Sequence, residues 1–379
     1  MKKASIIFLI VSLSSLVLIL KLNPSYSYRL QSYIPVPAYI PDSLQIILNE
    51  DSKVYIGAYK DQMKGRETLY PKANYSNVLF INQGDTSKVK LRPKGDWATH
   101  IERDNFSFRL KQQKGKSYYH KNKKLSFHDP SERNFIFEYV FHQFLENEGI
   151  LNLDYDFVSV RLNNIKYCYA VEDAMGKSYL EKNKIEGPIY KFDETALFNQ
   201  IENKSSLKEP SDRQQYQAAS LLVRGGKAKN DSVHFLNNKT EEGIQIDSFN
   251  IDQTAKYFAI CDLFGGAHAL RWHNVKIVKR NGLLEFIGSD ANPIYYLTLS
   301  IDKDLPLIDE FFKSKAFVEL YKRYLTKYLN EDYVVSFLMD RNIEIKSRIK
   351  LLQEYYPKSD NNLAFLFANI QGFLKREDL

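Results

Sequence analysis

The sequence predicts an α+β protein with two lobes, in which a β-rich lobe precedes a helical lobe. Short runs of alternating apolar and polar residues fill the region from 44 to 172, and such alternation is typical of half-buried strands. From residue 305 onward, apolar residues recur at the three- and four-residue spacing of amphipathic helices. The 379 residues, 44% of them hydrophobic, suffice for roughly two domains with sizeable cores.

The N-terminus carries the pattern of an export signal. Two lysines, Lys2 and Lys3, precede an uncharged run over residues 4–20. This run reaches the lower length limit of a membrane span and no clear cleavage site follows it. We therefore expect an uncleaved anchor at residues 1–22, with cleavage and secretion as the alternative. The lysines before the span predict an extracytoplasmic body, and the Pro-, Ser- and Tyr-rich residues 23–41 predict an extended stem.

The β-rich lobe is expected over residues 42–198. An antiparallel sheet is predicted from strand-like runs at residues 44–48, 53–57, 78–81, 88–92 and 106–111. A helix at residues 131–147 follows, with a cap signal at Asp129 and Gly149 behind its end. Two further strands, at 157–162 and 167–172, are joined by a turn at Asn163 and Asn164.

The rest of the chain divides into an insertion and a helical lobe. Residues 199–250 are polar and irregular, which predicts a linker or surface insertion. The lobe at residues 251–379 should begin with a helix at 251–264 and a hairpin of two strands, 274–278 and 283–287. Helical spacing then predicts helices at residues 307–317, 317–329, 333–356 and 362–373.

Composition excludes several classes of protein. The net charge of +7 is spread along the chain and no recognition motif accompanies it, which argues against a nucleic-acid-binding protein. The run from Lys114 to Lys124 holds five lysines and predicts a solvated hairpin, where acidic or phosphate-rich partners are possible. Cys168 and Cys261 lie in apolar runs, which favours buried free thiols, with a single disulfide as the alternative.

Several short sequence blocks occur in an order that can be compared with the order of motifs in known families. Blocks at residues 94–97, 107–111 and 124–134 are followed by blocks at 167–173, 186–189 and 263–274, and then by Asp290. Over residues 85–300 these blocks resemble the spore-coat CotH kinase-like family. The resemblance implies an atypical protein-kinase-like fold with a β-rich and a helical lobe. It also implies ATP and magnesium as cofactors, and phosphoryl transfer to protein hydroxyls.

The resemblance implies roles for five residues of the first lobe. Gly95 would let backbone approach phosphate, although an ordinary hairpin turn would also use a glycine. Arg109 and Lys111 share one face of a strand and would contact phosphate oxygens, with Lys111 as the strand lysine; a solvated strand face is the alternative. Glu138 would pair with that lysine, or else with Arg133 or solvent. Glu172 would mark the hinge that holds the nucleoside, or be an ordinary strand-end charge.

The second lobe supplies the expected catalytic residues. Asn274 and Asp290 resemble the paired metal ligands of kinases, with a hairpin between them. The family pattern breaks before Asn274, because His268 stands about where the family has its catalytic Asp. Either His268 or Asp262 could accept the hydroxyl proton, or the site has lost transfer activity.

Two alternative functions stay open at the level of sequence. The same cluster, with His268, His273 and two carboxylates, could hold zinc in a metal-dependent hydrolase. A kinase-like envelope protein without catalysis could instead bind a nucleotide, a glycan or a neighbouring protein. The leading prediction is a membrane-anchored kinase-like protein whose partners are a nucleotide, the membrane and a protein substrate.

Overall fold

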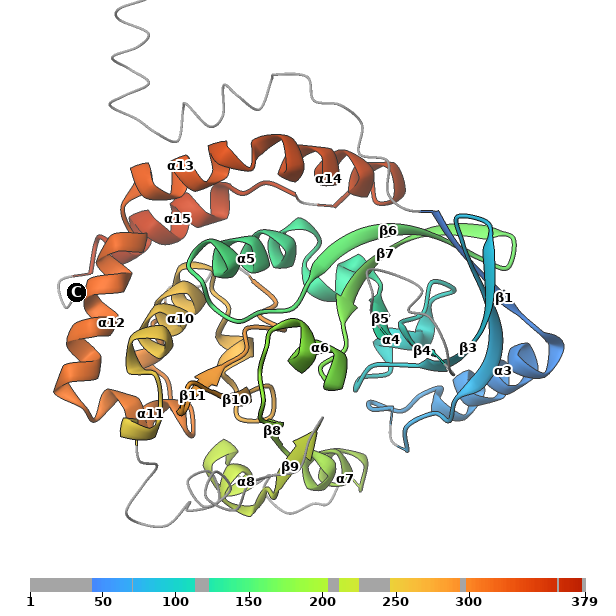
Figure 1. The fold of residues 1–379 in the computed structure, drawn as a ribbon, viewed down its shortest axis with the longest axis horizontal. Coiled ribbons are helices and arrows are strands. Elements are labelled where there is room, and N and C mark those ends of the chain that lie inside the picture. The colour runs from blue at the N-terminus through green and yellow to red at the C-terminus, as the bar shows by residue number, and fades with distance from the viewer. Residues whose placement is uncertain are drawn as a thin grey trace, which may run out of the picture.

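The computed structural model describes residues 43–69, 71–112, 123–203, 211–224, 246–293, 298–359 and 361–376. It shows a mixed α/β protein with a β-rich N-terminal region and a helical C-terminal region (Figure 1). The order of the two regions is the one that the sequence pattern predicts. The predicted anchor at residues 1–22 and the predicted stem at 23–41 lie outside the described residues.

The antiparallel sheet that the sequence predicts for the N-terminal region closes into a barrel. Its strand order is β1-β2-β3-β4-β5-β7-β6, and it closes because β1 pairs in parallel with β6. All other neighbours in the barrel are antiparallel. The strands are β1 (Ser43–Leu48), β2 (Ser76–Asn82), β3 (Asp85–Pro93), β4 (Phe108–Gln112), β5 (Lys124–His128), β6 (Tyr155–Leu162) and β7 (Ile165–Asp173).

The barrel interior is apolar, and the outer face is polar on β3, β4 and β5 but apolar on β6 and β7, where α5 (Ile136–Asn147) packs against it. Alternate residues of each strand, such as Leu91, Leu110 and Leu125, are buried inside together with stacked rings of Phe108 and Phe127. Residues between them, such as Arg109 and Lys111, therefore point outward. The turn at Asn163 between β6 and β7 is confirmed, with a φ of 54° at Asn163.

One predicted strand is instead helical. Residues 53–57 belong to α3 (Glu50–Met63), which covers one end of the barrel. The Asn49 side chain caps this helix by accepting a hydrogen bond of 2.8 Å from the amide of Ser52. Ile56, Tyr59 and Met63 are buried at helical spacing. The short apolar run around residue 55 resembles a strand only because the cap and the later buried positions lie outside it.

The predicted helix at residues 131–147 is divided in two. A short helix, η1 (Pro130–Arg133), is followed by α5 (Ile136–Asn147). Asn134 and Phe135 separate them with φ values of 50° and 53°, which an α-helix cannot contain. The turn of η1 is thereby directed sideways from the axis of α5, and this orientation matters for the position of Arg133.

A second, four-stranded sheet lies beside the barrel with the order β11-β10-β8-β9. The predicted hairpin of the second lobe forms β10 (Lys276–Arg280) and β11 (Leu283–Phe286), as expected. In the region predicted as a linker or surface insertion, residues 211–224 form α8 (Asp212–Ala218) and β9 (Leu221–Arg224), so this part has regular structure. Residues 204–210 and 225–245 of that linker lie outside the description. The remaining elements of this region are α4 (Thr99–Glu102), α6 (Lys177–Lys182), β8 (Ile189–Phe192) and α7 (Thr195–Asn203).

The C-terminal region is a layer of helices around a central one. The predicted helix at 251–264 is α10 (Ile251–Leu263), which lies against α12 and shares a core with α5. The single helix predicted at 333–356 is instead two helices that meet at Arg341. The other elements are η2 (Ile246–Ser248), η3 (Ala267–Leu270), η4 (Ser300–Asp302), α11 (Ile308–Phe312), α12 (Lys315–Tyr328), α13 (Glu331–Asp340), α14 (Asn342–Tyr355) and α15 (Ala364–Phe373).

Two further observations bear on the sequence predictions. Within the described residues, no helix combines the length and apolar character that a membrane crossing would need. Cys168 and Cys261 are both buried free thiols, so the alternative of a disulfide between them is not realised. Burial raises the pKa of both thiols.

Candidate functional site

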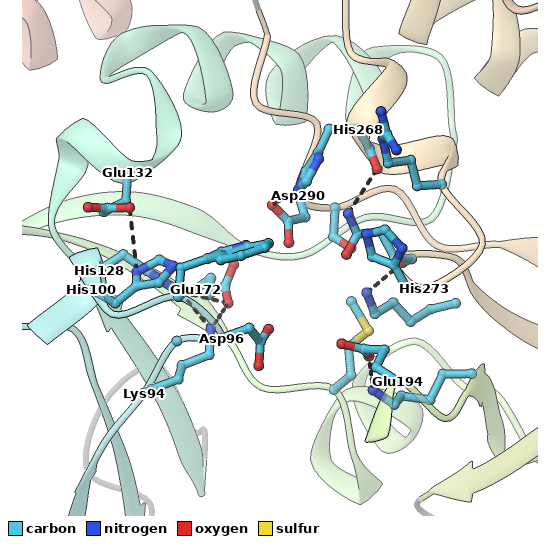
Figure 2. Close-up of a pocket in the computed structure, with 18 of the residues that line it drawn as sticks. Lys94, Asp96, His100, His128, Glu132, Glu172, Glu194, His268, His273 and Asp290 are labelled. Carbon is cyan, nitrogen blue, oxygen red and sulfur yellow. Dashed lines mark hydrogen bonds and ion pairs between the residues drawn. The ribbon is translucent and has the colours of Figure 1, made fainter. Parts of the chain in front are cut away.

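A cavity of about 580 Å³ lies between the outer face of the barrel and the second sheet (Figure 2). Its volume falls within the range of about 300–1,000 Å³ that small-molecule sites occupy. Basic side chains outnumber carboxylates among the described residues that line it. These basic residues are Lys72, Arg92, Lys94, Arg109, Arg133, Lys191, Arg224, Arg271 and Lys276.

The barrel contributes a compact group of three charged or titratable side chains, which we name the barrel wall: Lys94, His128 and Glu172. The Lys94 ammonium donates a hydrogen bond of 2.9 Å to Glu172 Oε1. The Nε2 atom of His128 lies 2.7 Å from Lys94 Nζ and 2.9 Å from the same Glu172 oxygen. Burial lowers the pKa of Lys94 to about 7, although Glu172 opposes this change. Lys94 is thus poised to gain charge when an anion approaches.

The strand register places the three residues of the barrel wall, Lys94, His128 and Glu172, close together. Glu172 on β7 is opposite Ser126 on β5, which in turn is opposite Arg109 on β4. Lys94 directly follows β3, and its amide donates to Ser107 O at 2.8 Å. Burial alone would raise the pKa of Glu172, but Lys94 and His128 hold it well below its ordinary value. The carboxylate therefore stays charged inside the cavity.

Gly95 lets the chain turn tightly behind Lys94. Its φ is +136°, and a Cβ atom at this position would lie 2.4 Å from the side chain of His100. The glycine is therefore required by close approach to His100 and is not part of an ordinary hairpin turn. Burial, followed by the charges of Arg133 and Lys94, lowers the pKa of His100 to about 4. His100 is thus neutral near pH 7.

Opposite the barrel wall lies a second group, which we name the loop wall: His268, His273, Asn274, Ser289 and Asp290. Asp290 follows β11 at a φ of +60°, and its Oδ1 lies 3.6 Å from His268 Nε2. Asn274 donates from Nδ2 to the carbonyl of His268 at 2.9 Å, which fixes the segment between them. Burial and nearby cations lower the pKa of His268 to about 4 and that of His273 to about 3. Both rings are therefore neutral near pH 7.

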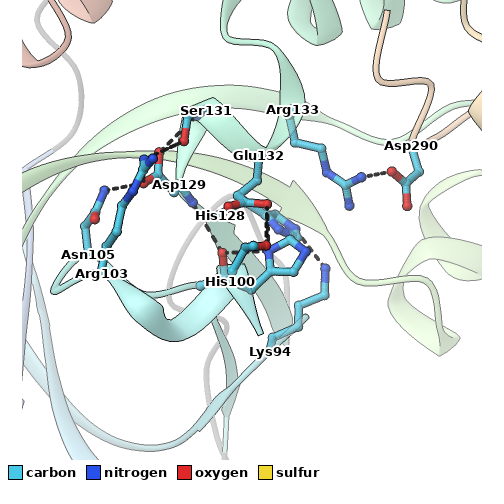
Figure 3. Close-up of polar contacts among 12 residues, drawn as sticks. Lys94, His100, Arg103, Asn105, His128, Asp129, Ser131, Glu132, Arg133 and Asp290 are labelled. Atoms are coloured by element: carbon cyan, nitrogen blue, oxygen red, sulfur yellow. Dashed lines mark hydrogen bonds and ion pairs between the residues drawn. The ribbon is translucent and has the colours of Figure 1, made fainter. Parts of the chain in front are cut away.

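Arg133 joins the two sides of the cavity. It reaches from η1 to form an ion pair with Asp290, as Figure 3 shows. The η1 turn is held by Asp129, which accepts hydrogen bonds from the Ser131 amide at 2.9 Å and Asn105 Nδ2 at 2.8 Å. The Arg103 guanidinium also donates to Asp129 at 3.1 Å. Arg133 is thus presented to Asp290 by a rigid turn.

Glu138 fixes the segment that follows Asp290. Its buried carboxylate accepts hydrogen bonds from the amides of Ala291 at 3.1 Å and Asn292 at 2.8 Å. Burial alone would raise the pKa of Glu138, but His142, Arg133 and the Ala291 amide hold it below its ordinary value. Glu138 therefore acts on the position of Asp290 from behind the cavity and does not pair with a cavity lysine.

Several buried polar atoms of the site have no hydrogen-bond partner among the residues that the structure describes. They are His128 Nδ1 on the barrel wall and Arg133 Nε, His273 Nδ1 and Ser289 Oγ on the side of Asp290. Buried polar atoms in folded proteins are nearly always satisfied by protein, water or ligand. Three such atoms around Asp290 indicate that this side of the cavity is arranged to bind a polar group.

The structure brings together seven of the residues to which the sequence assigns a candidate catalytic or binding role. Those lining the cavity are Gly95, Arg109, Glu172, His268, His273, Asn274 and Asp290. Glu138 lies behind the loop that follows Asp290. Lys111 and Asp262 do not line the cavity, so the positions expected for the strand lysine and for the alternative base are wrong.

The prediction that Lys111 and Asp262 lie in the cavity is wrong for two different reasons. Lys111 shares the outer face of β4 with Arg109, but it is exposed because the cavity covers only the Arg109 end of that strand. Asp262 points into the helical core, where it accepts hydrogen bonds from Ser300 and from the Tyr321 hydroxyl at 2.6 Å. Its role is structural.

Among the cavity residues, Lys94 and His128 of the barrel wall were given no role by the sequence, and Arg133 entered only as an alternative partner of Glu138. All three cavity residues lie within the blocks at residues 94–97 and 124–134 that carry the family resemblance. The signal was therefore present, but the strand register needed to bring them together could not be read from it.

The arrangement does not support a zinc site. Among the described residues, no three His, Cys, Asp or Glu side chains are grouped so that they could hold a metal ion. His268 and His273 have ring centroids 6.3 Å apart, with edge-to-face planes, and Asp290 is the carboxylate near His268, at 3.6 Å.

Comparisons with known proteins give little support for an assignment. No family model matches the chain, and no curated protein matches it. Among solved structures, the chain is similar to the toxin HipA of Shewanella oneidensis MR-1, solved with HipB and operator DNA. The match has 12% identity and a TM-score of 0.30, and it covers 90% of this chain and 73% of HipA. A likeness this weak carries no argument, and the family resemblance stays a prediction.

Proposed function

We propose that the chain is a CotH-like atypical kinase that transfers phosphate from ATP to protein hydroxyls at the cell envelope. The observation that carries the proposal is the placement of the Lys94–Glu172 ion pair across one cavity from Asn274 and Asp290. A phosphoryl-transfer site needs a lysine on the phosphates and oxygen ligands for a metal ion on the opposite side. The predicted anchor at residues 1–22 supports the envelope location.

The cations of the cavity suit the triphosphate. Lys94 would contact phosphate oxygens with an ammonium that Glu172 orients, and Arg109 adds a guanidinium beside it. An incoming phosphate would favour the protonated form of Lys94, whose pKa is about 7 in the free protein. Nucleotide binding is therefore expected to be accompanied by proton uptake near neutral pH.

Magnesium would be held by Asp290 and the side-chain oxygen of Asn274. Magnesium in such sites usually takes one or two carboxylates and completes its shell with phosphate oxygens and water, so the donor set fits. The ion would neutralise charge on the phosphates. The ion pair between Arg133 and Asp290 must open or share the carboxylate for this to happen.

The proton of the acceptor hydroxyl would pass to His268. The hydroxyl oxygen forms a bond to the terminal phosphorus, the bond from that phosphorus to the bridging oxygen of ADP breaks, and His268 Nε2 takes the proton. His268 is neutral near pH 7 and its Nε2 faces Asp290 at 3.6 Å. Asp290 is placed to stabilise the imidazolium that forms.

One observation favours the runner-up, a kinase-like protein that binds without catalysis. Arg133 occupies the carboxylate of Asp290, the residue on which a metal ion would depend. In that case the same cavity would bind an anionic ligand through its cations alone. The alternative differs from the proposal in needing no metal.

Thermal unfolding of the full chain in a neutral detergent, with and without Mg-ATP, tests the proposal. Ligand at about 100 times its dissociation constant stabilises the native state by about 2.7 kcal/mol. We expect this shift in the wild type and in a control, Asp302→Asn, which loses a surface ion pair with Arg376. Asp290→Asn keeps the side-chain size and should lose the shift.

Transfer itself is measured with ATP labelled at the terminal phosphate and an envelope protein fraction. A shift that requires magnesium, together with label on protein, supports the kinase. A shift that persists in chelator and gives no labelled protein establishes the binding alternative. The absence of any shift at millimolar Mg-ATP contradicts the kinase and leaves a protein that binds some other ligand.

A further inference from the structure

The outer face of β3, β4 and β5 carries a cluster of cations that continues into the cavity. Lys88, Lys90 and Arg92 alternate along β3, Arg109 and Lys111 along β4, and Lys124 begins β5. Residues spaced by two point to the same face of a strand, and the buried leucines between them fix this face as the outer one. We name these six residues the basic face.

The strand register sets like charges directly opposite one another on the basic face. Lys90 is opposite Lys111, Lys111 is opposite Lys124, and Arg92 is opposite Arg109. Directly opposed side chains in a sheet have Cβ atoms about 4.5–5.5 Å apart, and like charges at that distance destabilise the sheet. No ion pair relieves this repulsion, because within the described part of the chain none of the six forms one with a carboxylate.

The electrostatic consequence is visible in the half-buried Lys124. Burial and the charges of Arg109, Arg224, Arg92 and Lys111 lower its pKa to about 8. A cluster of cations that repel one another without relief is a surface that an anionic partner would stabilise.

The basic face leads to the proposed reaction site. Arg92 and Arg109 at its inner end also line the cavity, whereas Lys88, Lys90 and Lys111 are exposed outside it. Three strands about 4.8 Å apart and a row from residue 88 to 92 define an area of about 10 by 14 Å. This area matches about four or five residues of an extended chain.

We propose that the basic face docks an acidic, extended segment of the protein that accepts phosphate, so that a neighbouring hydroxyl enters the cavity. This inference rests on the proposed function, because it names the class of its acceptor. A single-stranded nucleic acid fits less well, since the outward positions of these strands hold Lys, Arg, Ser, Thr and the buried His128 and offer no exposed aromatic ring for base stacking.

The test measures binding of a fluorescein-labelled peptide of five Glu-Ser repeats to the full chain in neutral detergent, without nucleotide. The comparison peptide has five Gln-Ser repeats. The variant Lys88→Ser/Lys90→Ser removes two exposed charges that lie outside the cavity. The control Arg161→Ser/Lys166→Ser removes another exposed pair of opposed cations, from β6 and β7, that does not line the cavity.

We expect the acidic peptide to bind at least tenfold more tightly than the neutral one. The basic-face variant should weaken it about tenfold, given up to about 1 kcal/mol for each exposed charge contact, and the control should not. The Mg-ATP shift of Asp302→Asn and of both double variants should equal that of the wild type.

Four results overturn the inference: equal binding of both peptides, equal weakening by both double variants, tighter binding of a 12-nucleotide oligothymidylate, or tighter binding of phosphatidylglycerol vesicles. The outcome is separable from that of the proposed function. Specific peptide binding without any Mg-ATP shift leaves the basic face standing and removes the kinase. An Mg-ATP shift without specific peptide binding supports the nucleotide site and removes the basic face as a docking surface.

Discussion

The two walls of the cavity differ in how many of their buried polar atoms have hydrogen-bond partners within the same wall. On the barrel wall, Lys94, His128 and Glu172 bind one another at 2.7–2.9 Å, and His128 Nδ1 is the one buried polar atom of these three side chains without a partner among the described residues. On the loop wall, His273 Nδ1 and Ser289 Oγ are buried with no hydrogen-bond partner among the described residues. The countercharge of Asp290, Arg133, comes from a different segment of the chain. The barrel wall is therefore preorganised by its sheet, whereas the loop wall is arranged for a partner that it does not itself supply.

This comparison predicts that the largest effect comes from breaking the barrel wall. Lys94→Met leaves Glu172 buried without its cation, and removing one partner of a buried ion pair costs about 3–5 kcal/mol. Because a charge-assisted hydrogen bond to phosphate is also lost, affinity for Mg-ATP should fall about 10- to 100-fold. Chemical denaturation and calorimetry measure the two effects.

Lys111→Met is the matched control for that variant. It removes the same charge from an exposed position on the same barrel, outside the cavity. Neither stability nor nucleotide affinity should fall. The opposite result would be a loss of affinity in Lys111→Met with none in Lys94→Met. It would support Lys111 as the phosphate-contacting lysine, as the sequence predicts, and contradict that role for Lys94 of the barrel wall.

An intermediate effect is expected from pH, through His100 beside the barrel wall. Its pKa of about 4 in the folded protein lies below the ordinary value, so the unfolded chain takes up a proton first as pH falls. Stability should therefore decline between about pH 6.5 and pH 4. Glu132, at 3.8 Å, has a raised pKa and acts in the opposite direction.

His100→Gln should reduce the loss of stability between pH 7 and pH 5 by about 2 kcal/mol. Denaturant unfolding at each pH measures this difference. An unchanged pH profile in the variant would show that other groups, such as the cavity carboxylates, control the acid sensitivity.

The smallest effect is expected from removing a buried hydroxyl. It distinguishes a hydroxyl that binds a ligand from one that is buried without contacting a ligand. Ser289→Ala removes a hydroxyl without a partner, so the free protein should be unchanged or about 1 kcal/mol more stable. Its affinity for Mg-ATP should nevertheless fall. Ser159→Ala, at another buried hydroxyl without a described partner in β6, should change stability in the same way and leave affinity intact.

Isothermal titration of both serine variants beside the wild type supplies the measurement. Equal affinities for Ser289→Ala and the wild type would mean that the loop wall does not meet the nucleotide. The contrast between the two walls would then reflect packing alone.

Much of the local structure could be predicted from the sequence. The helix α10 and the hairpins β6–β7 and β10–β11 were predicted, because apolar spacing and turn residues lie within the elements themselves. Asn274 and Asp290 flank the second hairpin and were both expected near each other for that reason. The prediction of a strand at 53–57 is wrong, because five residues are too few to show helical spacing. That spacing becomes visible only when Tyr59 and Met63 are included.

The sequence by itself determined the order of the two regions, most elements and the residue types that could bind phosphate. Tertiary structure decided which of those residues meet. Barrel closure requires β1 to pair with β6, more than 100 residues away. The pairing of β5 with β7 places Glu172 where it meets Lys94 rather than Lys111. Packing of α10 against α12 turns Asp262 into the core. The physical reason is that hydrogen bonds of helices and turns are local, whereas the face of a strand that borders a cavity depends on distant pairing.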